Sequence, residues 1–233
     1  MPILAVLPPE IEPDNFVSFM EECGIDKAVV CRYVEGESIW IDNEVVGLAV
    51  KKYLGKLIGF FWVKPEDEKV RQDIKLAVDE WGFMGLKVHL EMNEAAIDRF
   101  RLIFNETEQF QIPIYIHIGE DYESLDKLCH EFKEVNVILG HLGTGVYRLD
   151  PKRLEKSLRL SEKHNNLFLE TSGNTYPFVR KAVEVLGPAK IVFGIDLPHT
   201  HPLVEVRMIE LLNLSKKEEN LIFADNIRKI LNI

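Results

Sequence analysis

Residues 113–139 read PIYIHIGEDYESLDKLCHEFKEVNVIL, and this stretch decides the fold class. Two short runs rich in β-branched residues, Ile114–Ile118 and Asn136–Leu139, are typical of buried strands. Between them, apolar residues recur with the 3.6-residue period of an amphipathic helix, at Leu125, Leu128, Cys129 and Phe132. A strand, a helix and a strand in this order predict a parallel βα unit.

The same alternation extends along the whole chain. Six further runs are predicted strands: Ile3–Leu7, Lys27–Cys31, Leu57–Val63, Gly85–Val88, Leu167–Glu170 and Ile191–Phe193. Eight strand–helix units in 233 residues predict a TIM (β/α)₈ barrel, regular or distorted, as a single domain of residues 1–233. An open doubly wound sheet is the alternative, but no G-x-G-x-x-G follows the first strand.

Glycine and serine residues support the predicted helix ends. Gly24 is expected to end the first helix in a left-handed conformation. Ser215 and Glu218 are predicted to form a capping box at the last helix. His130 and His164, in or beside predicted helices, are expected at the surface.

Composition narrows the classes of partner. The chain has 38 acidic and 28 basic residues, a net charge of −10 that disfavours binding to nucleic acid or anionic lipid. Three cysteines without a C-x-x-C fit a reducing compartment. The opening MPILAVLPPE lacks the basic segment of a signal peptide, and no run of 18 apolar residues occurs. We therefore expect a cytoplasmic protein with a small-molecule substrate and no nucleic-acid or membrane partner.

Polar residues follow several predicted strands, where barrels of this kind carry their catalytic groups. They are Lys87, His117, His141, Glu170 and Asp196, with His199 and His201 further along the last loop. Imidazole and carboxylate groups suit zinc or a similar divalent ion, which lowers the pKa of a bound water to about 7. These residues therefore predict a site at the carboxyl ends of the strands. Cys31 also ends a strand, but without a neighbouring base it is predicted to be inert.

Six segments follow one another in a recognisable order: GLKVHL, PIYIHIGE, VNVILGHLGTG, LFLETSGNT, IVFGIDLPH and IFADNIRKILNI. Together they resemble the successive blocks of the amidohydrolase-related family, in the branch that contains aminocarboxymuconate-semialdehyde decarboxylase. The resemblance runs from about Gly24 to the last residue. It implies a metal-dependent barrel enzyme and is compatible with a homodimer.

The resemblance also implies a role for each matching residue. His117 matches the metal ligand of strand five, and Asp196 matches the strand-eight aspartate that contacts the metal and its water. His141 matches a histidine that acts on the substrate as a general acid or base. Lys87 is expected to bind substrate together with His141, although an ion pair between Lys87 and Glu170 is equally compatible with the sequence.

The first strand departs from the family pattern. An H-x-H pair is usual there, and the segment ILAVLPPE places Val6 and Pro8 at the two positions. Neither residue binds metal. His199 and His201 are the candidate replacements, which makes His117, Asp196, His199 and His201 the predicted ligands of a divalent metal, zinc by preference. The alternative is that the metal is absent.

Three functions remain open on the sequence. The first is a metal-dependent hydrolase that acts on a small carboxylate-bearing lactone, amide or ester, with Asp196 and His141 moving protons. The second is a metal-dependent decarboxylase on the same scaffold. The third is a non-catalytic barrel with a binding role, since a fold does not determine a function.

Overall fold

A computed structural model describes residues 2–7, 11–32, 39–89, 97–145, 149–197 and 199–233, with the backbone alone for residues 2–7. Eight strands alternate with helices along the chain. The strands are β1 (Pro2–Leu7), β2 (Lys27–Arg32), β3 (Leu57–Trp62), β4 (Gly85–His89), β5 (Ile114–His117), β6 (Val137–Leu139), β7 (Leu167–Glu170) and β8 (Ile191–Val192). Each predicted strand is present, and each boundary lies within one residue of its predicted position.

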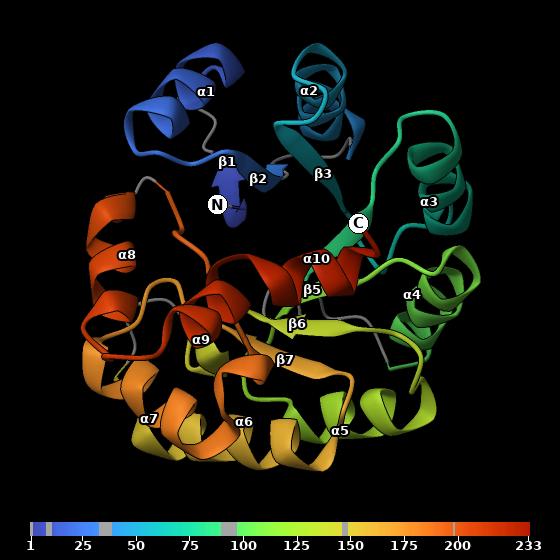
Figure 1. Cartoon of the computed structure of the whole chain (residues 1–233). Helices are drawn as coiled ribbons and strands as arrows, with labels where there is room; N and C mark the ends of the chain where they lie inside the picture. Colours follow the sequence, from blue (N-terminus) through green and yellow to red (C-terminus); the bar gives the residue numbers. More distant parts are fainter. Residues whose placement is uncertain (1, 8–10, 33–38, 90–96, 146–148, 198) are drawn as a thin grey trace.

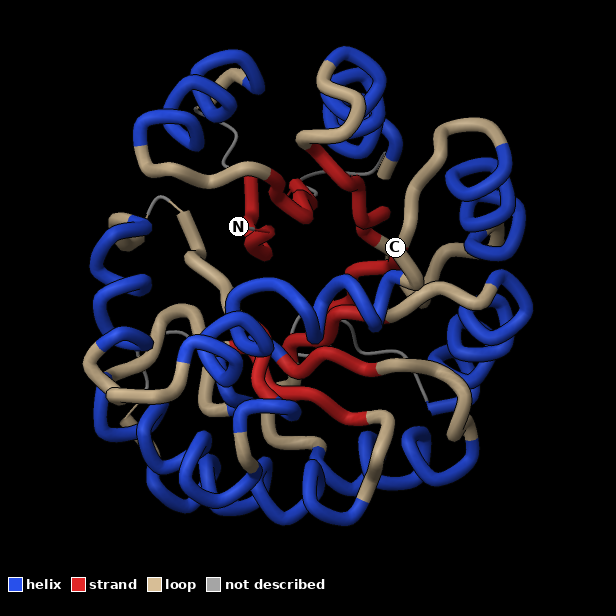
Figure 2. The backbone as a smooth tube through the Cα atoms, in the orientation of Figure 1, coloured by secondary structure: helices blue, strands red, loops and turns tan. Residues whose placement is uncertain are grey.

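The strands form one parallel sheet in chain order, β1 to β8. In a doubly wound sheet the order of the strands reverses at a switch point. The unbroken order β1 to β8 therefore excludes that alternative fold. Figure 2 shows the strands curling around a centre with most of the helices outside them. The prediction of an α/β barrel is therefore confirmed, and all the carboxyl ends of the strands lie at one end of it, here called the mouth.

Helices follow the strands and cover the outside of the sheet (Figure 1). They are α1 (Pro13–Glu22), α2 (Trp40–Lys52), α3 (Val70–Asp79), α4 (Ile97–Phe110), α5 (Tyr122–Glu131), α6 (Pro151–Lys163), α7 (Tyr176–Leu186), α8 (Pro202–Glu210), α9 (Lys216–Asn220) and α10 (Asn226–Leu231). Gly24 is left-handed just beyond α1, and Ser215 forms its capping box with Glu218, both as predicted. Short 3₁₀ turns, η2 (Gly140–Gly143) and η3 (Pro188–Lys190), follow β6 and precede β8.

The C-terminal segment lies beside the last strand. A π-helical turn, η4 (Leu221–Asp225), contacts both β1 and β8. The Phe193 backbone N–H donates to the Ile222 carbonyl at 3.1 Å, so the turn takes a hydrogen bond that a further strand would otherwise take. The Asn226 amide donates to the carbonyls of Pro188 and Ile191 at 2.8 and 2.7 Å. These bonds hold the C-terminus at the amino-terminal end of the barrel, opposite the mouth.

The strands are buried on both faces, as expected for a parallel sheet covered by helices. Every residue of β3, β6 and β7 is buried. Among the described residues, none of the helices has the length and apolar character that crossing a membrane requires.

Candidate functional site

Strand register brings Lys87 between two aromatic residues. Trp62 of β3 lies beside Lys87 of β4, which lies beside Tyr115 of β5. The Lys87 ammonium sits 3.9 Å from the centre of the Tyr115 ring and 5.4 Å from that of Trp62. The lysine is fully buried, and its Nζ has no hydrogen-bond partner among the described residues. Burial lowers the pKa of Lys87 to about 7, although the nearby Cys31, Asp196 and Glu170 oppose the shift.

Three imidazoles continue this layer toward the mouth. His89 stacks on Trp62 at a centroid distance of 6.1 Å and meets the His117 ring at 4.8 Å. His117 in turn lies 4.3 Å from the ring of His141. Burial, helped by the charge of Lys87, lowers the pKa of His89 to about 3 and that of His117 well below its ordinary value. The rings of His89 and His117 therefore remain neutral at neutral pH.

The backbone after β6 is held in an uncommon conformation. His141 and its neighbour Leu142 both have left-handed dihedral angles, with φ of 54° and 51°. Gly140 precedes them because a Cβ there would overlap the His117 ring. Non-glycine residues in this region are strained, and such strain is common at functional sites. The turn places the His141 side chain inside the barrel, where it is only 2% exposed.

The His141 ring has one bonded and one unbonded nitrogen. Its Nδ1 lies 3.0 Å from the backbone carbonyl of Ser172, which can only accept a hydrogen bond. His141 Nδ1–H is therefore the donor, and Nε2 is buried with no hydrogen-bond partner in the described part of the chain. This arrangement leaves Nε2 available to a substrate.

Glu170 connects the residues around the two histidines. Its Oε2 accepts from the Tyr115 hydroxyl, the His141 backbone N–H and the Ser172 hydroxyl at 3.1, 3.1 and 3.0 Å. Its Oε1 accepts from the Ser172 backbone N–H at 2.6 Å. Residue 194 is glycine because a Cβ there would overlap Glu170 Oε1. The predicted ion pair between Lys87 and Glu170 is replaced by these four bonds.

Asp196 follows β8 and is also left-handed, with φ of 43°. It is 8% exposed, and its Oδ2 has no hydrogen-bond partner among the described residues. A second buried carboxyl, Glu205 of α8, lies near it. Burial raises the pKa of Glu205 to about 8, and the charges of Glu170 and Asp196 add to that shift. The mouth thus contains three carboxyl groups, two of which, those of Asp196 and Glu170, lie near Lys87.

The two loop histidines lie at the surface. His199 and His201 are both exposed. His201 caps α8 by accepting the Leu203 N–H through Nδ1 at 3.2 Å, and its ring packs edge-on against Phe19 at 5.3 Å. Val6 pairs with Cys31 at the end of β1, whereas Pro8 lies outside the described residues.

The described side chains do not form a preassembled site for a divalent metal. Within the described ranges, no three His, Cys, Asp or Glu residues form a group able to hold one. Nε2 of His117 lies 3.0 Å from the Tyr115 hydroxyl, and Nδ1 of His201 is used by its cap. The ligand set of His117, Asp196, His199 and His201 therefore stays a prediction.

Two other histidine and cysteine predictions have clear outcomes. Burial raises the pKa of Cys31 to about 12, which fits the expected inert thiol. His164 was expected at the surface, and that prediction is wrong. The residue is 6% exposed because its Nε2 pairs with Asp126 Oδ1 of α5 at 2.5 Å.

Several site residues were not selected from the sequence. Tyr115 lies two positions before His117, and this period of two along a strand was the available signal. Ser172 and Glu205 reach the mouth through a loop and a helix. No local pattern indicates that they lie there.

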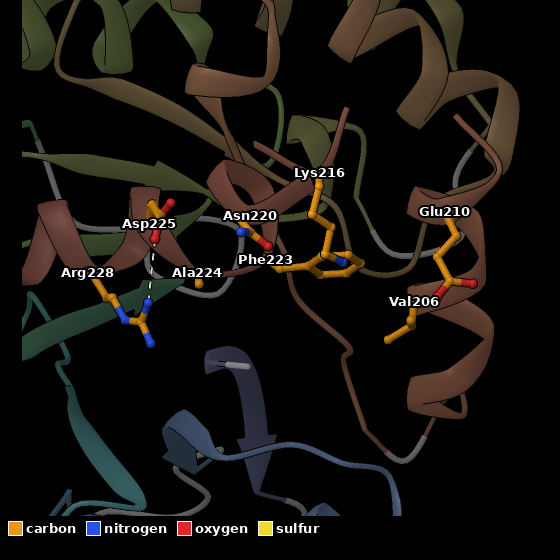
Figure 3. Close-up of a pocket in the computed structure, with 8 residues that line it drawn as sticks. All are labelled: Val206, Glu210, Lys216, Asn220, Phe223, Ala224, Asp225 and Arg228. Atoms are coloured by element: carbon orange, nitrogen blue, oxygen red, sulfur yellow. Dashed lines mark hydrogen bonds and ion pairs between the residues drawn. The ribbon is translucent and has the colours of Figure 1, made fainter. Parts of the chain in front are cut away.

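A pocket of about 380 Å³ lies at the opposite end of the barrel (Figure 3). Phe223 lines it together with the end of α8 and residues of α9 and α10. Its Arg228 pairs with Asp225 at 3.4 Å, and its Lys216 pairs with Glu219 at 3.1 Å. Because these cations are paired and distant from the strand carboxyl ends, the mouth is the better candidate site.

The family model described as amidohydrolase matches residues 33–233. No curated protein sequence matches the chain.

Solved structures of three decarboxylases share the fold at low sequence identity. A 2,6-dihydroxybenzoate decarboxylase from Rhizobium has a TM-score of 0.77 and 15% identity, covering 100% of this chain and 99% of its own. A dihydroxybenzoic acid decarboxylase from Polaromonas, with bound manganese and 2-nitroresorcinol, has a TM-score of 0.79 and 17% identity, covering 99% and 96%. A 5-carboxyvanillate decarboxylase from Novosphingobium aromaticivorans, with manganese and a nitrobenzoic acid, has a TM-score of 0.75 and 19% identity, covering 94% and 79%.

Proposed function

We propose that this chain, which belongs to the amidohydrolase family, decarboxylates a small aromatic carboxylic acid at the mouth of the barrel. One observation carries the proposal. Lys87 Nζ, His141 Nε2 and Asp196 Oδ2 are buried polar atoms without a hydrogen-bond partner among the described residues. Buried polar atoms in a native protein are normally bonded, so unbonded ones at a mouth suit a ligand.

The rings around Lys87 support an aromatic substrate. Trp62, His89, His117 and Tyr115 present a set of aromatic and imidazole rings beside the ammonium. A planar anion can contact such rings while its charge is offset by Lys87. The three similar decarboxylases act on acids of this kind, which favours the same class here.

The proposed reaction needs a base, an acid and a stabilised anion. Asp196 takes the proton of a hydroxyl on the substrate ring, which raises the electron density of the carbon that bears the carboxylate. His141 Nε2, after taking up a proton from solvent, gives it to that carbon. The bond to the carboxylate then breaks, neutral CO₂ leaves, and the electron pair returns to the ring. Lys87 offsets the negative charge that stays on the substrate, and the hydroxyl regains its proton from Asp196.

Hydrolysis of a lactone, amide or ester is the second candidate. It is the first of the three functions that the sequence leaves open, and the same His141 and Asp196 would move its protons. It needs an activated water, which a divalent ion normally supplies in this family. The similar structures described above are decarboxylases, and this places hydrolysis second.

The test uses the full chain and a panel of small acids. Release of CO₂ is measured from 2,6-dihydroxybenzoate, 5-carboxyvanillate and related hydroxybenzoates, and ring opening is measured on small lactones bearing a carboxylate. Each assay is run after treatment with chelator and again with added Mn²⁺ or Zn²⁺. H141N is the inactive variant, and H130N, on the outer helix α5, is its matched control.

Stoichiometric CO₂ release that is lost in H141N and retained in H130N supports the proposal. Ring opening of a lactone without CO₂ release would reject the decarboxylase proposal and support the hydrolase. Binding of the acids without turnover under every metal condition replaces it with a binding role. Activity that appears only with added metal supports the predicted divalent ion.

A further inference from the structure

We propose that Glu170 is a positioning residue that fixes opposite tautomers in two adjacent histidines, Nε2–H in His117 and Nδ1–H in His141. The inference concerns hydrogen bonds within the chain and holds for any substrate. Its catalytic consequence rests on the proposed function.

The argument begins with the charge on Glu170. Four donors converge on this carboxyl: two backbone N–H groups, from Ser172 and His141, and two hydroxyls, from Tyr115 and Ser172. A backbone N–H has no alternative but to donate. A protonated carboxyl would oppose one of these donors with its own hydrogen, so the ionised form matches the site. The residue is fully buried and no water is needed to satisfy it.

The tautomer of His117 follows from the single proton of Tyr115. The Tyr115 hydroxyl donates that proton to Glu170 Oε2 at 3.1 Å. Its oxygen can then only accept in the second contact, which is with His117 Nε2 at 3.0 Å. His117 therefore carries its hydrogen on Nε2, and its Nδ1 keeps a lone pair.

The tautomer of His141 is set by the loop that Glu170 anchors. Glu170 Oε1 accepts the Ser172 N–H at 2.6 Å, and Oε2 accepts the Ser172 hydroxyl. These bonds hold the Ser172 carbonyl 3.0 Å from His141 Nδ1, which must donate to it. A further bond from the His141 backbone N–H to Oε2 fixes the left-handed turn that carries the ring.

The two rings thus have opposite roles although they lie 4.3 Å apart. His141 presents a lone pair at Nε2, where it can accept and then deliver a proton. His117 uses Nε2 in its bond to the Tyr115 hydroxyl inside the protein. One carboxylate that contacts neither reacting atom thereby decides which histidine moves protons.

Nitrogen NMR tests the inference without a substrate. The full chain is labelled with ¹⁵N-histidine, and long-range ¹H–¹⁵N correlation spectra at pH 8 distinguish the two neutral tautomers of each ring. H117Q and H141Q assign the two signals among the seven histidines by their disappearance. The expected result is a single Nε2–H form for His117 and a single Nδ1–H form for His141.

Three variants separate the contributions. Y115F removes one hydroxyl and is expected to reduce the Nε2–H preference of His117 about fivefold, the effect of one hydrogen bond, while His141 is unchanged. E170Q places an amide among four donors and is expected to alter both histidines. E205Q changes another buried carboxyl of the mouth that bonds to neither ring, and both tautomers should persist. Circular dichroism confirms that each variant is folded.

The same tautomer in both histidines of the wild-type protein would overturn the inference. An unchanged tautomer preference of His117 in folded Y115F would overturn it as well. If E170Q does not fold, Y115F and the wild-type spectrum still decide the outcome for His117. A correct tautomer pattern in a protein that releases no CO₂ would reject the proposed function alone.

Discussion

Two lysines at opposite ends of the barrel differ in how their ammonium groups are hydrogen-bonded. Lys190 precedes β8, and its Nζ donates to the carbonyls of His164, Asn165 and Leu167 at 2.7, 3.0 and 3.0 Å. Lys87 ends β4 and has no hydrogen-bond partner among the described residues. Burial lowers the pKa of both, to about 8 for Lys190 and about 7 for Lys87. Of these two ammonium groups, only that of Lys190, at the amino-terminal end, donates hydrogen bonds to described residues.

The same contrast extends to the neighbours of each lysine. At the amino-terminal end, the Asn166 amide donates to three carbonyls, those of Cys129, Phe132 and Val135. At the mouth, His141 and Asp196 each keep a buried atom without a bond in the described structure. Satisfied polar groups stabilise a fold, whereas unsatisfied ones cost stability and await a ligand. The comparison separates residues that hold the barrel from residues that we propose to act on a substrate.

The largest expected effect is the loss of catalytic activity in the K87M variant. Removal of the ammonium leaves the substrate anion without its counter-charge, and kcat/KM for CO₂ release should fall roughly 100- to 1,000-fold. K190M is the matched control and should leave kcat/KM of the folded protein within about threefold. Steady-state kinetics on both variants measure the difference. Equal losses in the two variants would abolish the distinction between the ends of the barrel.

The next effect is on stability, in N166A. The carbonyls of Cys129 and Val135 lose their donor, while that of Phe132 keeps the Val135 N–H, so the free energy of unfolding should fall by about 2 kcal/mol. Urea unfolding followed by circular dichroism measures it. N165A is the control because Asn165 is exposed, and its change should stay within about 0.5 kcal/mol. Stability equal to that of the wild type in N166A would show that these bonds are replaced by water.

The two lysine variants should also shift stability in opposite directions. At pH 7, K190M should lose about 1–2 kcal/mol, because the Asn165 carbonyl loses its donor while the carbonyls of His164 and Leu167 keep one other donor each. K87M should gain a similar amount, because it removes a buried ammonium without a bonded partner. The folded-state pKa of Lys87, about 7, lies below the ordinary value of 10.5, so the unfolded chain binds more protons between these limits. Wild-type stability therefore rises with pH over this window, and the gain from K87M should shrink. Urea unfolding at pH 7 and pH 9.5 checks both signs.

The smallest expected effect is the pH-dependent stability of E205Q. The folded-state pKa of Glu205, about 8, lies above the ordinary value of 4.5. The unfolded carboxyl ionises between these limits while the folded one stays neutral, so wild-type stability falls as pH rises from 4.5 to 8. E205Q avoids this loss and should be more stable than the wild type at pH 8, with no difference at pH 4. A pH-independent difference in thermal unfolding would argue against the neutral carboxyl.

Much of the fold was predictable because it depends on local patterns. Apolar runs with a period of 3.6 residues, or buried throughout, decide which segments become helices or strands. The regular alternation of the two then restricts the topology to a barrel. The positions of Lys87, His117 and His141 at one end of the molecule follow directly, because parallel strands bring their carboxyl ends together. His164 was misjudged because its burial depends on Asp126, 38 residues earlier.

The chemistry of the site was decided by contacts between distant segments. Glu170 reaches Tyr115 across 55 residues and His141 across 29, and no pattern along the chain records those pairings. Hydrogen bonds select which nitrogen of each histidine carries the proton, and they exist only once the strands lie side by side. The sequence by itself determined the barrel and the residues at its mouth, because hydrophobic periodicity is a local property. Only the tertiary structure decided which of those residues are satisfied by the fold and which remain available to a ligand, because that depends on three-dimensional proximity.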